Sequence, residues 1–347
     1  MWRAERCDLC GDCLVKCRYA NYEREKAIVE MRLLKEGKEA EILEKCITCL
    51  ACNDYCPTGA EPADLITRLQ EKFGTSPVVK TGMFALDEII KGLEGKGDPR
   101  EVIEGEPDKP ILSLDSFRFQ QFPPGTFESE LFRGLTIVRG GEFMSLAGCV
   151  HMGGASLVEK YGQKVLDRWA AFGKEIVYMH NEGFILAHVK AKEFGFRVNF
   201  KYMHLFEYLS RYLKDHRDRV QKLGKKVAYQ ANCATRWIPE YDRFLGEIFE
   251  LIGVDRPGRR FEGINALCCS APVIFANKEL ALEIQRENLE DAIASGAEAI
   301  ITSCPICNWV LSRPSAKYGL PKIFITDLVR MALGEISWPA PERRDEK

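Results

Sequence analysis

The second half of the chain alternates short apolar runs with longer amphipathic stretches. The apolar runs predict four strands, at VAYQA (227–231), INAL (264–267), AIIT (299–302) and KIFIT (322–326). The amphipathic stretches 239–252 and 278–294 predict helices between these strands. Alternation of this kind is typical of α/β units whose strands are largely parallel.

The N-terminal region follows a different pattern. Residues 18–45 are charged and rich in helix formers, which predicts one or two helices. A further helix is predicted over 62–73, and Gly74 suits its C-terminal end. Residues 75–108 combine proline, glycine and many charges. We therefore interpret them as a connecting segment with one short helix at about 84–93.

A weak internal repeat follows the connecting segment. Residues 148–184 resemble 268–308, and 109–117 can be laid on 225–233. Residues 109–334 are therefore predicted to be two copies of one α/β module, of which the first keeps a single thiol. In this alignment Phe117 faces Cys233, Gly148 and Cys149 face Cys268 and Cys269, His180 or Asn181 faces Cys304, and Gly183 or Phe184 faces Cys307.

Charge and hydropathy exclude two classes of protein. The 347 residues include 49 Lys and Arg and 51 Asp and Glu, a net charge of −2 that argues against a general nucleic-acid binder. The longest uncharged stretches, 143–158 and 263–277, are shorter than the roughly 20 apolar residues of a membrane span. The N-terminus has no apolar signal-peptide core. We expect a cytoplasmic protein that reaches a membrane only through a partner.

Cysteine is the unusual component, because the chain has fourteen and thirteen of them fall into three groups. In a reducing cytosol such groups indicate metal or redox chemistry. The first two groups are Cys7-x2-Cys10-x2-Cys13-x3-Cys17 and Cys46-x2-Cys49-x2-Cys52-x3-Cys56-Pro57.

Each of these runs has the spacing of a ferredoxin motif. Three thiolates at intervals of three reach three irons of one 4Fe–4S cubane, and the fourth thiolate ligates the other cluster. Structural zinc usually shows paired CxxC arms, which two runs of four do not fit. Arg18 follows Cys17 where a proline is expected, but no ligand is lost. The predicted sets are Cys7, Cys10, Cys13 and Cys56 for cluster 1, and Cys46, Cys49, Cys52 and Cys17 for cluster 2.

The third group has five cysteines in three parts: Cys233, Cys268-Cys269 and Cys304-x2-Cys307. The parts are about one βα unit apart, which predicts that all lie at the carboxyl ends of strands. Pro305 suits a helix start, whose free N–H groups would face an anionic site. Five thiols exceed the needs of a tetrahedral ion or a regular cubane and suit an open, non-cubane iron–sulfur cluster. The alternative is that Cys268 and Cys269 are merely buried small residues.

This C-x(n)-C-C-x(n)-C-x2-C arrangement resembles the cysteine-rich CCG domain. That domain occurs in the B-type and D-type catalytic polypeptides of heterodisulfide reductases and in iron–sulfur components of sulfite, glycolate, lactate, glycerol-3-phosphate and benzoyl-CoA redox complexes. Its fusion to a two-cubane ferredoxin domain resembles the D-type polypeptide. The resemblance implies that Cys233, Cys268, Cys269, Cys304 and Cys307 hold a non-cubane 4Fe–4S cluster at which a disulfide is cleaved or formed. Cys268 and Cys269 are then the candidate catalytic ligands.

Two departures from the family pattern bear on function. Ser270 follows Cys269 where the family has glycine, and a positive φ is disfavoured for serine. The first module has also lost its ligands, whereas heterodisulfide reduction in this family is thought to use two such clusters. Single-cluster relatives act on a protein thiol or serve as electron-transfer subunits.

Two functional hypotheses remain open. In the first, an iron–sulfur subunit of a multi-subunit oxidoreductase passes electrons to a non-cubane cluster that reduces or forms a disulfide. In the second, the chain is an electron conduit within a dehydrogenase or acyl-CoA reductase complex. No nucleotide or flavin fingerprint is visible, so we expect electrons from a flavin, cytochrome or electron-bifurcating partner subunit. A zinc-bearing scaffold is a third, non-redox alternative.

The histidines suggest little by themselves. His151, His180 and Cys149 could form a relict metal site, but no ligand-pair spacing supports it. We therefore interpret them, with His188 and His204, as polar residues on strand ends and helix faces. The predicted fold is α+β, with a ferredoxin-type domain at 1–74, a linker at 75–108, a degenerate CCG module at 109–224, a complete one at 225–334, and a charged tail at 335–347.

Overall fold

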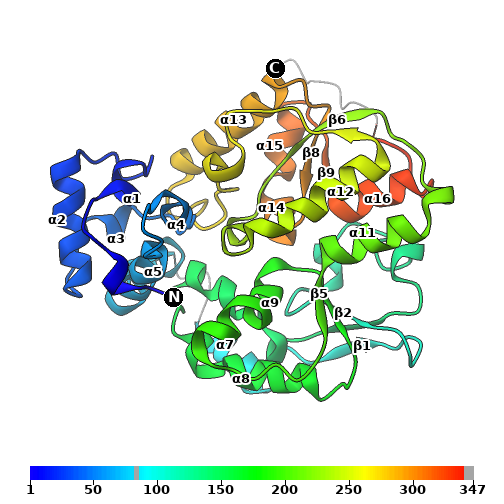
Figure 1. Cartoon of the computed structure of the whole chain (residues 1–347), viewed down its shortest axis with the longest axis horizontal. Helices are drawn as coiled ribbons and strands as arrows, with labels where there is room; N and C mark the ends of the chain where they lie inside the picture. Colours follow the sequence, from blue (N-terminus) through cyan, green and yellow to red (C-terminus); the bar gives the residue numbers. More distant parts are fainter. Residues whose placement is uncertain (82–85, 340–347) are drawn as a thin grey trace.

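The computed structural model describes residues 1–81 and 86–339. A helical N-terminal part lies beside two α/β modules, which are stacked on each other (Figure 1). The helix predicted at about 84–93 is described from α7 (Leu86–Leu93), and residues 84–85 lie outside the described residues. Residues 340–347 of the predicted tail also lie outside them.

Short helices separated by tight loops form the N-terminal part. The predicted helices over 18–45 and 62–73 are confirmed, and the latter ends at Gly74 with φ +67°. Leu14, Met31, Ile42 and Ile66 form the centre of its small core. The helices are α1 (Asp12–Val15), α2 (Arg24–Lys35), α3 (Ile42–Lys45), α4 (Ala51–Tyr55) and α5 (Pro62–Phe73); α6 (Pro77–Lys80) follows.

The first module is built on a five-stranded sheet in the order β1-β3-β2-β4-β5. All pairs are parallel except β1 with β3, so the sheet begins inside the segment interpreted as a linker. The strands are β1 (Glu101–Ile103), β2 (Ile111–Ser113), β3 (Thr136–Arg139), β4 (Ile176–Tyr178) and β5 (Tyr202–His204). The helices are α8 (Leu157–Ala170), α9 (Asn181–Ile185), α10 (Ala191–Phe194) and α11 (Leu205–Asp215).

The second module has a parallel sheet in the order β7-β6-β8-β9. The predicted strands at 227–231, 299–302 and 322–326 and the helix at 278–294 are confirmed in place. The strands are β6 (Lys225–Tyr229), β7 (Val254–Asp255), β8 (Ala299–Thr302) and β9 (Lys322–Phe324). The helices are α12 (Asp242–Ile252), α13 (Lys278–Ala294), α14 (Pro305–Val310), α15 (Ser312–Lys317) and α16 (Ile325–Ala332).

One predicted strand is wrong. The run 264–267 contains no strand; it overlaps a 3-10 turn at Gly263–Asn265, and the strand of this unit is β7 instead. Gly263 has φ +57° and the Ile264 side chain is 59% exposed. Leu267 packs with the cysteines rather than into the sheet. The apolar run therefore leads the chain into a site, and periodicity alone does not distinguish this from a short strand.

The two sheets share one order, since β3-β2-β4-β5 corresponds to β7-β6-β8-β9. Matching order is expected for two copies of one unit. The copies also share a core, because α11 packs beside α12 between the sheets (Figure 1). That core takes buried side chains from both copies, including Leu112, Leu205, Leu209, Leu245, Ile248, Ile301 and Leu328. Among the described residues, no helix is long and apolar enough to cross a membrane.

Candidate metal centres

The two N-terminal cysteine loops have the same backbone shape. Leu9 in the first loop and Thr48 in the second have φ +61° and +58°. Gly11 and Leu50, two residues further on, have φ +77° and +64°. Left-handed residues on both sides of the middle cysteine curl each loop so that its thiols point inward. Equal spacing thus produces equal geometry in both motifs.

The N-terminal cysteines line two separate cavities. Each cavity takes three thiols from one motif and the last thiol of the other, which is the arrangement that the spacing predicted. The assignment of an iron–sulfur cubane to each cavity stays a prediction. Cys7, Cys10, Cys13 and Cys56 line one cavity, and Cys17, Cys46, Cys49 and Cys52 line a larger one of about 490 Å³.

The surroundings of these thiols suit a cationic metal group. Burial, with the nearby Cys17 thiol, raises the pKa of the Cys49 thiol to about 11. Backbone N–H groups of Thr48 and Ala60 donate to the sulfurs of Cys46 and Cys56, each at 3.3 Å. Such donors stabilise sulfur that carries negative charge. Binding of iron would have to displace the thiol protons, which couples metal binding to pH.

The five-cysteine group gathers at the carboxyl end of the second sheet. Cys233 opens a 3-10 turn four residues after β6, and Cys304 is the N-cap of α14, two residues after β8. Pro305 is the first residue of α14, as predicted, and Cys307 lies in its first turn. Cys268, Cys269, Cys304 and Cys307 are all buried and pack in one cluster.

Ser270 has a left-handed backbone conformation directly after the cysteine pair. Its φ is +71°, so the expectation that serine would avoid a positive φ is wrong at this position. The Ser270 N–H donates to Cys268 Sγ at 3.3 Å, and its hydroxyl donates to the Cys269 carbonyl at 2.6 Å. Gln285 Nε2 donates to Ser270 Oγ at 2.8 Å. These bonds fix the turn that presents the adjacent thiols.

Charge within the five-cysteine group is unevenly distributed. Hydrogen bonds from Cys268 and Cys307 hold the pKa of the Cys269 thiol well below its usual range. Burial opposes ionisation of Cys304, but a hydrogen bond from Cys307 and the charge of His180 lower its pKa to about 6. In contrast, burial raises the pKa of the Cys233 thiol, and hydrogen bonds to Cys269 raise the pKa values of the Cys268 and Cys307 thiols. Two of the five thiols are thus held toward the thiolate form, which binds metals, and the other three would have to lose a proton on metal binding.

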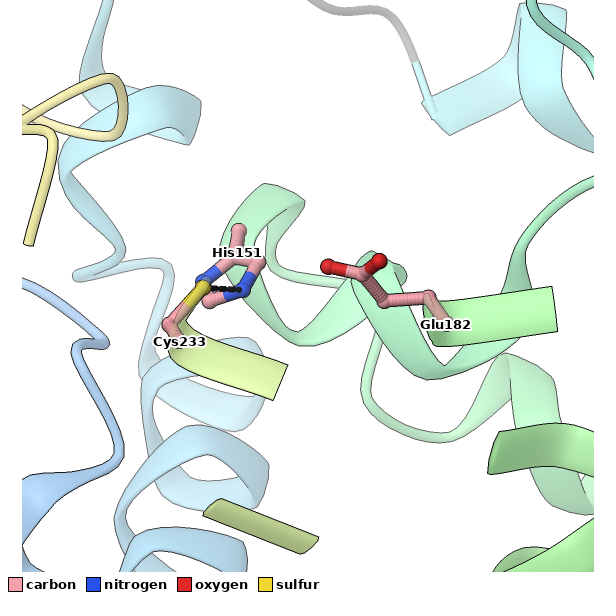
Figure 2. Close-up of side chains that lie close together, drawn as sticks. All are labelled: His151, Glu182 and Cys233. Carbon is pink, nitrogen blue, oxygen red and sulfur yellow. Dashed lines mark hydrogen bonds between the residues drawn. The ribbon is translucent and has the colours of Figure 1, made fainter. Parts of the chain in front are cut away.

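The first module contributes three side chains to this site. His151 Nε2 lies 3.2 Å from Cys233 Sγ, and His180 Nε2 lies 3.4 Å from Cys304 Sγ. Glu182 Oε2 lies 2.7 Å from His180 Nε2. Figure 2 shows His151, Glu182 and Cys233 converging from separate segments. His180 lies just after the end of β4 and His151 in the helical turn Leu146–Met152, which agrees with their interpretation as residues of strand ends and helix faces, and both also contact thiols of the five-cysteine site.

Cys149 does not join these histidines. It is fully buried in the apolar core of the first module with Phe143, Leu146 and Trp169. Cys149 therefore is not a third ligand beside His151 and His180. Sequence reasoning missed Glu182, although it lies in the segment that the repeat alignment places opposite Cys304 and Cys307.

The N-terminal domain touches the five-cysteine site. Tyr19, Ile47 and Cys49 pack in the cluster that contains Cys268 and Cys269. A narrow cavity is lined by Cys49 together with Cys233 and Cys268. The cysteines predicted to hold cluster 2 are therefore direct neighbours of the five-cysteine site.

A comparison with protein families identifies a known domain in the second module. Residues 227–312 match the family model of a cysteine-rich domain, CCG, and this span contains all five cysteines of the third group. The domain suggests an iron–sulfur redox protein of the heterodisulfide reductase kind. A search of curated proteins finds no match for the chain.

One solved structure is similar in fold over most of the chain. A hypothetical protein from Helicobacter pylori is similar with a TM-score of 0.57 at 14% sequence identity, over 88% of this chain and 64% of that one. At this identity the similarity concerns the fold alone. The chain spans less than two thirds of that protein's length.

Proposed function

We propose that the chain is an iron–sulfur subunit of a multi-subunit oxidoreductase of the heterodisulfide reductase kind. Electrons from a partner redox subunit would pass two 4Fe–4S cubanes and reach a non-cubane 4Fe–4S cluster held by the five cysteines. The observation that carries the proposal is the narrow cavity that Cys49 shares with Cys233 and Cys268. It brings a ligand of cluster 2 next to ligands of the terminal site.

The reaction at the terminal site would be reduction or formation of a disulfide. Reduction of one disulfide takes two electrons and two protons and yields two thiols. A cluster bound there would supply the electrons one at a time. The chain's own contribution is to hold Cys268 and Cys269 in the Ser270 turn and to keep water away, since the cluster of cysteines is buried. The two protons of the balance would be taken up by the product thiols as they leave the buried site for water.

A specific observation favours the conduit as a second candidate. Heterodisulfide reduction in the family is thought to use two five-cysteine sites, whereas this chain places His151, His180 and Glu182 beside the one set that it has. Cys268, Cys269, Cys304 and Cys307 are each at most 6% exposed. In this case the cluster relays electrons within a larger complex and performs no disulfide chemistry of its own.

Two measurements on the full chain test the proposal. Protein purified without oxygen should hold about twelve irons, whereas about eight would mean that the five-cysteine site lacks its cluster. Cys268→Ser should abolish disulfide reduction driven by reduced viologen while the spectroscopic signals of both cubanes persist. Cys149→Ala is the matched control, because Cys149 lies outside all three groups.

The outcomes separate the two candidates. Turnover that survives Cys268→Ser contradicts a catalytic role for this site. A wild-type chain with twelve irons that reduces no disulfide but oxidises the viologen in the presence of an electron acceptor supports the conduit.

A further inference from the structure

We propose that the chain holds one divalent first-row transition metal, zinc or ferrous iron, where the two modules meet, through His151 and Glu182 of the first module and Cys233 of the second. The site is distinct from the cubane cavities and borders the five-cysteine site through Cys233, which would be a shared thiolate. In this respect the inference rests on the proposed function. It gives the first module a part in a metal centre, through two side chains that are not thiols.

The three donor atoms already lie within reach of one ion. An imidazole nitrogen of His151, a carboxylate oxygen of Glu182 and Cys233 Sγ are all within 4.8 Å of one another. His151 Nε2 and Cys233 Sγ are 3.2 Å apart. Figure 2 shows the Glu182 carboxylate pointing toward the His151 ring from the opposite side. Ligand atoms about 2.0–2.3 Å from a tetrahedral ion lie roughly 3.3–3.8 Å apart, so the His151–Cys233 pair is already close to that spacing and Glu182 would join it by a side-chain adjustment.

His151 is oriented as a metal ligand. Its Nδ1 lies 2.9 Å from the Thr48 hydroxyl, which can accept the Nδ1–H. That tautomer leaves the lone pair of Nε2 directed at Cys233. A hydrogen bond on the far nitrogen is the usual companion of a ligating histidine, because it fixes both the ring and the tautomer.

Glu182 is a buried carboxylate whose charge is only partly compensated. The residue is 4% exposed, and its Oε2 has no hydrogen-bond partner in line, although His180 Nε2 lies 2.7 Å away. A buried charge needs both pairing and hydrogen bonds, so the arrangement leaves room for a cation. His180 would then be the outer partner of the ligating carboxylate.

A second group of possible metal ligands has no charge left for an ion to compensate. Glu61, Asp64 and Glu193 also converge, but Lys190 and the terminal amino group lie among them. With Arg3, which lies 3.1 Å from Glu61, three cations of the chain face the three carboxylates of that cluster. The site at His151 has instead one nitrogen, one oxygen and one sulfur donor, a mixture that suits zinc or iron and not calcium or magnesium. A fourth position would be open to water or substrate.

The test is elemental analysis of the full chain purified without oxygen. We expect about one zinc or one iron per chain beyond the cluster iron, with the element deciding between the two metals. His151→Ala and the isosteric Glu182→Gln should each lower this excess by about one, while the visible absorption of the clusters is kept. His216→Ala, at the far end of α11, should keep the full metal content.

Two results would overturn the proposal. Equal metal content in the wild type, His151→Ala and Glu182→Gln would show that Glu182 is only a counter-ion of His180. Loss of about four irons in His151→Ala would show that His151 supports the five-cysteine cluster and no separate ion. A wild type with about eight cluster irons plus one metal that His151→Ala removes would contradict the proposed function and leave this site standing. X-ray absorption of a zinc-loaded chain should show one sulfur neighbour among nitrogen and oxygen.

Discussion

Ser270 illustrates how one side chain can stabilise a backbone conformation that is costly for its residue type. A left-handed residue other than glycine costs about 1–2 kcal/mol. Here the serine hydroxyl lies between the Cys269 carbonyl and Gln285 Nε2, so two hydrogen bonds hold the turn. The absence of glycine after the cysteine pair therefore does not alter the turn that the pair requires.

His204 makes the stability of the chain depend on pH. Its Nδ1 accepts the Phe206 N–H at 3.1 Å, and its Nε2 lies 2.9 Å from Asn181 Oδ1. The ring is otherwise surrounded by Phe184 and Tyr241. Burial, together with the charges of His180 and His188, lowers the pKa of His204 to about 3. The folded state therefore excludes a proton that the unfolded chain binds below about pH 6.5.

This depressed pKa predicts a loss of stability on acidification. Its contribution is complete above the unfolded pKa of about 6.5 and falls by about 1.4 kcal/mol per pH unit below it, until the folded pKa is reached. Between pH 7.5 and 5.5 the wild type should lose roughly 1.4 kcal/mol more unfolding free energy than His204→Asn, which keeps a helix-capping acceptor. Urea unfolding at the two pH values measures this, and equal losses in both proteins would contradict it.

At the scale of elements, α11 and α12 join the two modules. Leu209 on α11 and Leu245 on α12 are fully buried in the shared core. Because that core takes side chains from both sheets, each module buries part of its apolar surface against the other, in addition to the smaller cores of its own. We expect the modules to unfold in one transition.

Truncation of one side chain in this core tests the coupling. Leu209→Ala should lower the free energy of unfolding by about 2–5 kcal/mol, because it leaves a cavity between the helices. Leu282→Ala on α13 is the control, since that side chain is 49% exposed and should cost far less. Hydrogen exchange should increase in both β4 and β8 of Leu209→Ala. An increase confined to the first module would show that the modules unfold separately.

The sequence predicted well the elements in which apolar residues are buried at the spacing of a helix or a strand. The helix at 278–294 and the strand at 299–302 are of this kind and have the predicted bounds. The run 264–267 failed because Ile264 is exposed and only Leu267 packs, against the cysteines. The roles of His151 and Glu182 could not be predicted, because contacts between distant segments leave no spacing along the chain.

At the scale of the whole molecule, a buried ionic cluster fastens the N-terminal domain to the first module. Lys190 Nζ lies 3.3 Å from Asp64 on α5 and 2.9 Å from Glu193, and it sits 4.7 Å from the Trp237 ring. The Met1 amino group also contacts Asp64, at 2.9 Å. Coulombic attraction to Lys190 and to this amino group outweighs burial and holds the pKa of Asp64 below its usual range.

Removal of the central cation should loosen this junction. Lys190→Met leaves the carboxylates of Asp64 and Glu193 short of a partner, and breaking a buried pair costs about 3–5 kcal/mol. Hydrogen exchange along α5 should increase while exchange along α13 stays unchanged. Lys192→Met removes an exposed lysine from α10, which begins directly after Lys190, and should leave exchange along both helices unchanged. Unchanged exchange along α5 in Lys190→Met would contradict this role.

The shared core between α11 and α12 also bears on why the first module, which has a single thiol, is present beside the second. A duplicated unit whose chemistry has become dispensable can be deleted only if its twin folds without it. Here the twin takes part of its interior from the altered copy, so selection on folding retains that copy whatever happens at its former ligand positions. Those positions are free to diverge toward new duties, because packing alone is enough to keep the altered copy in the chain.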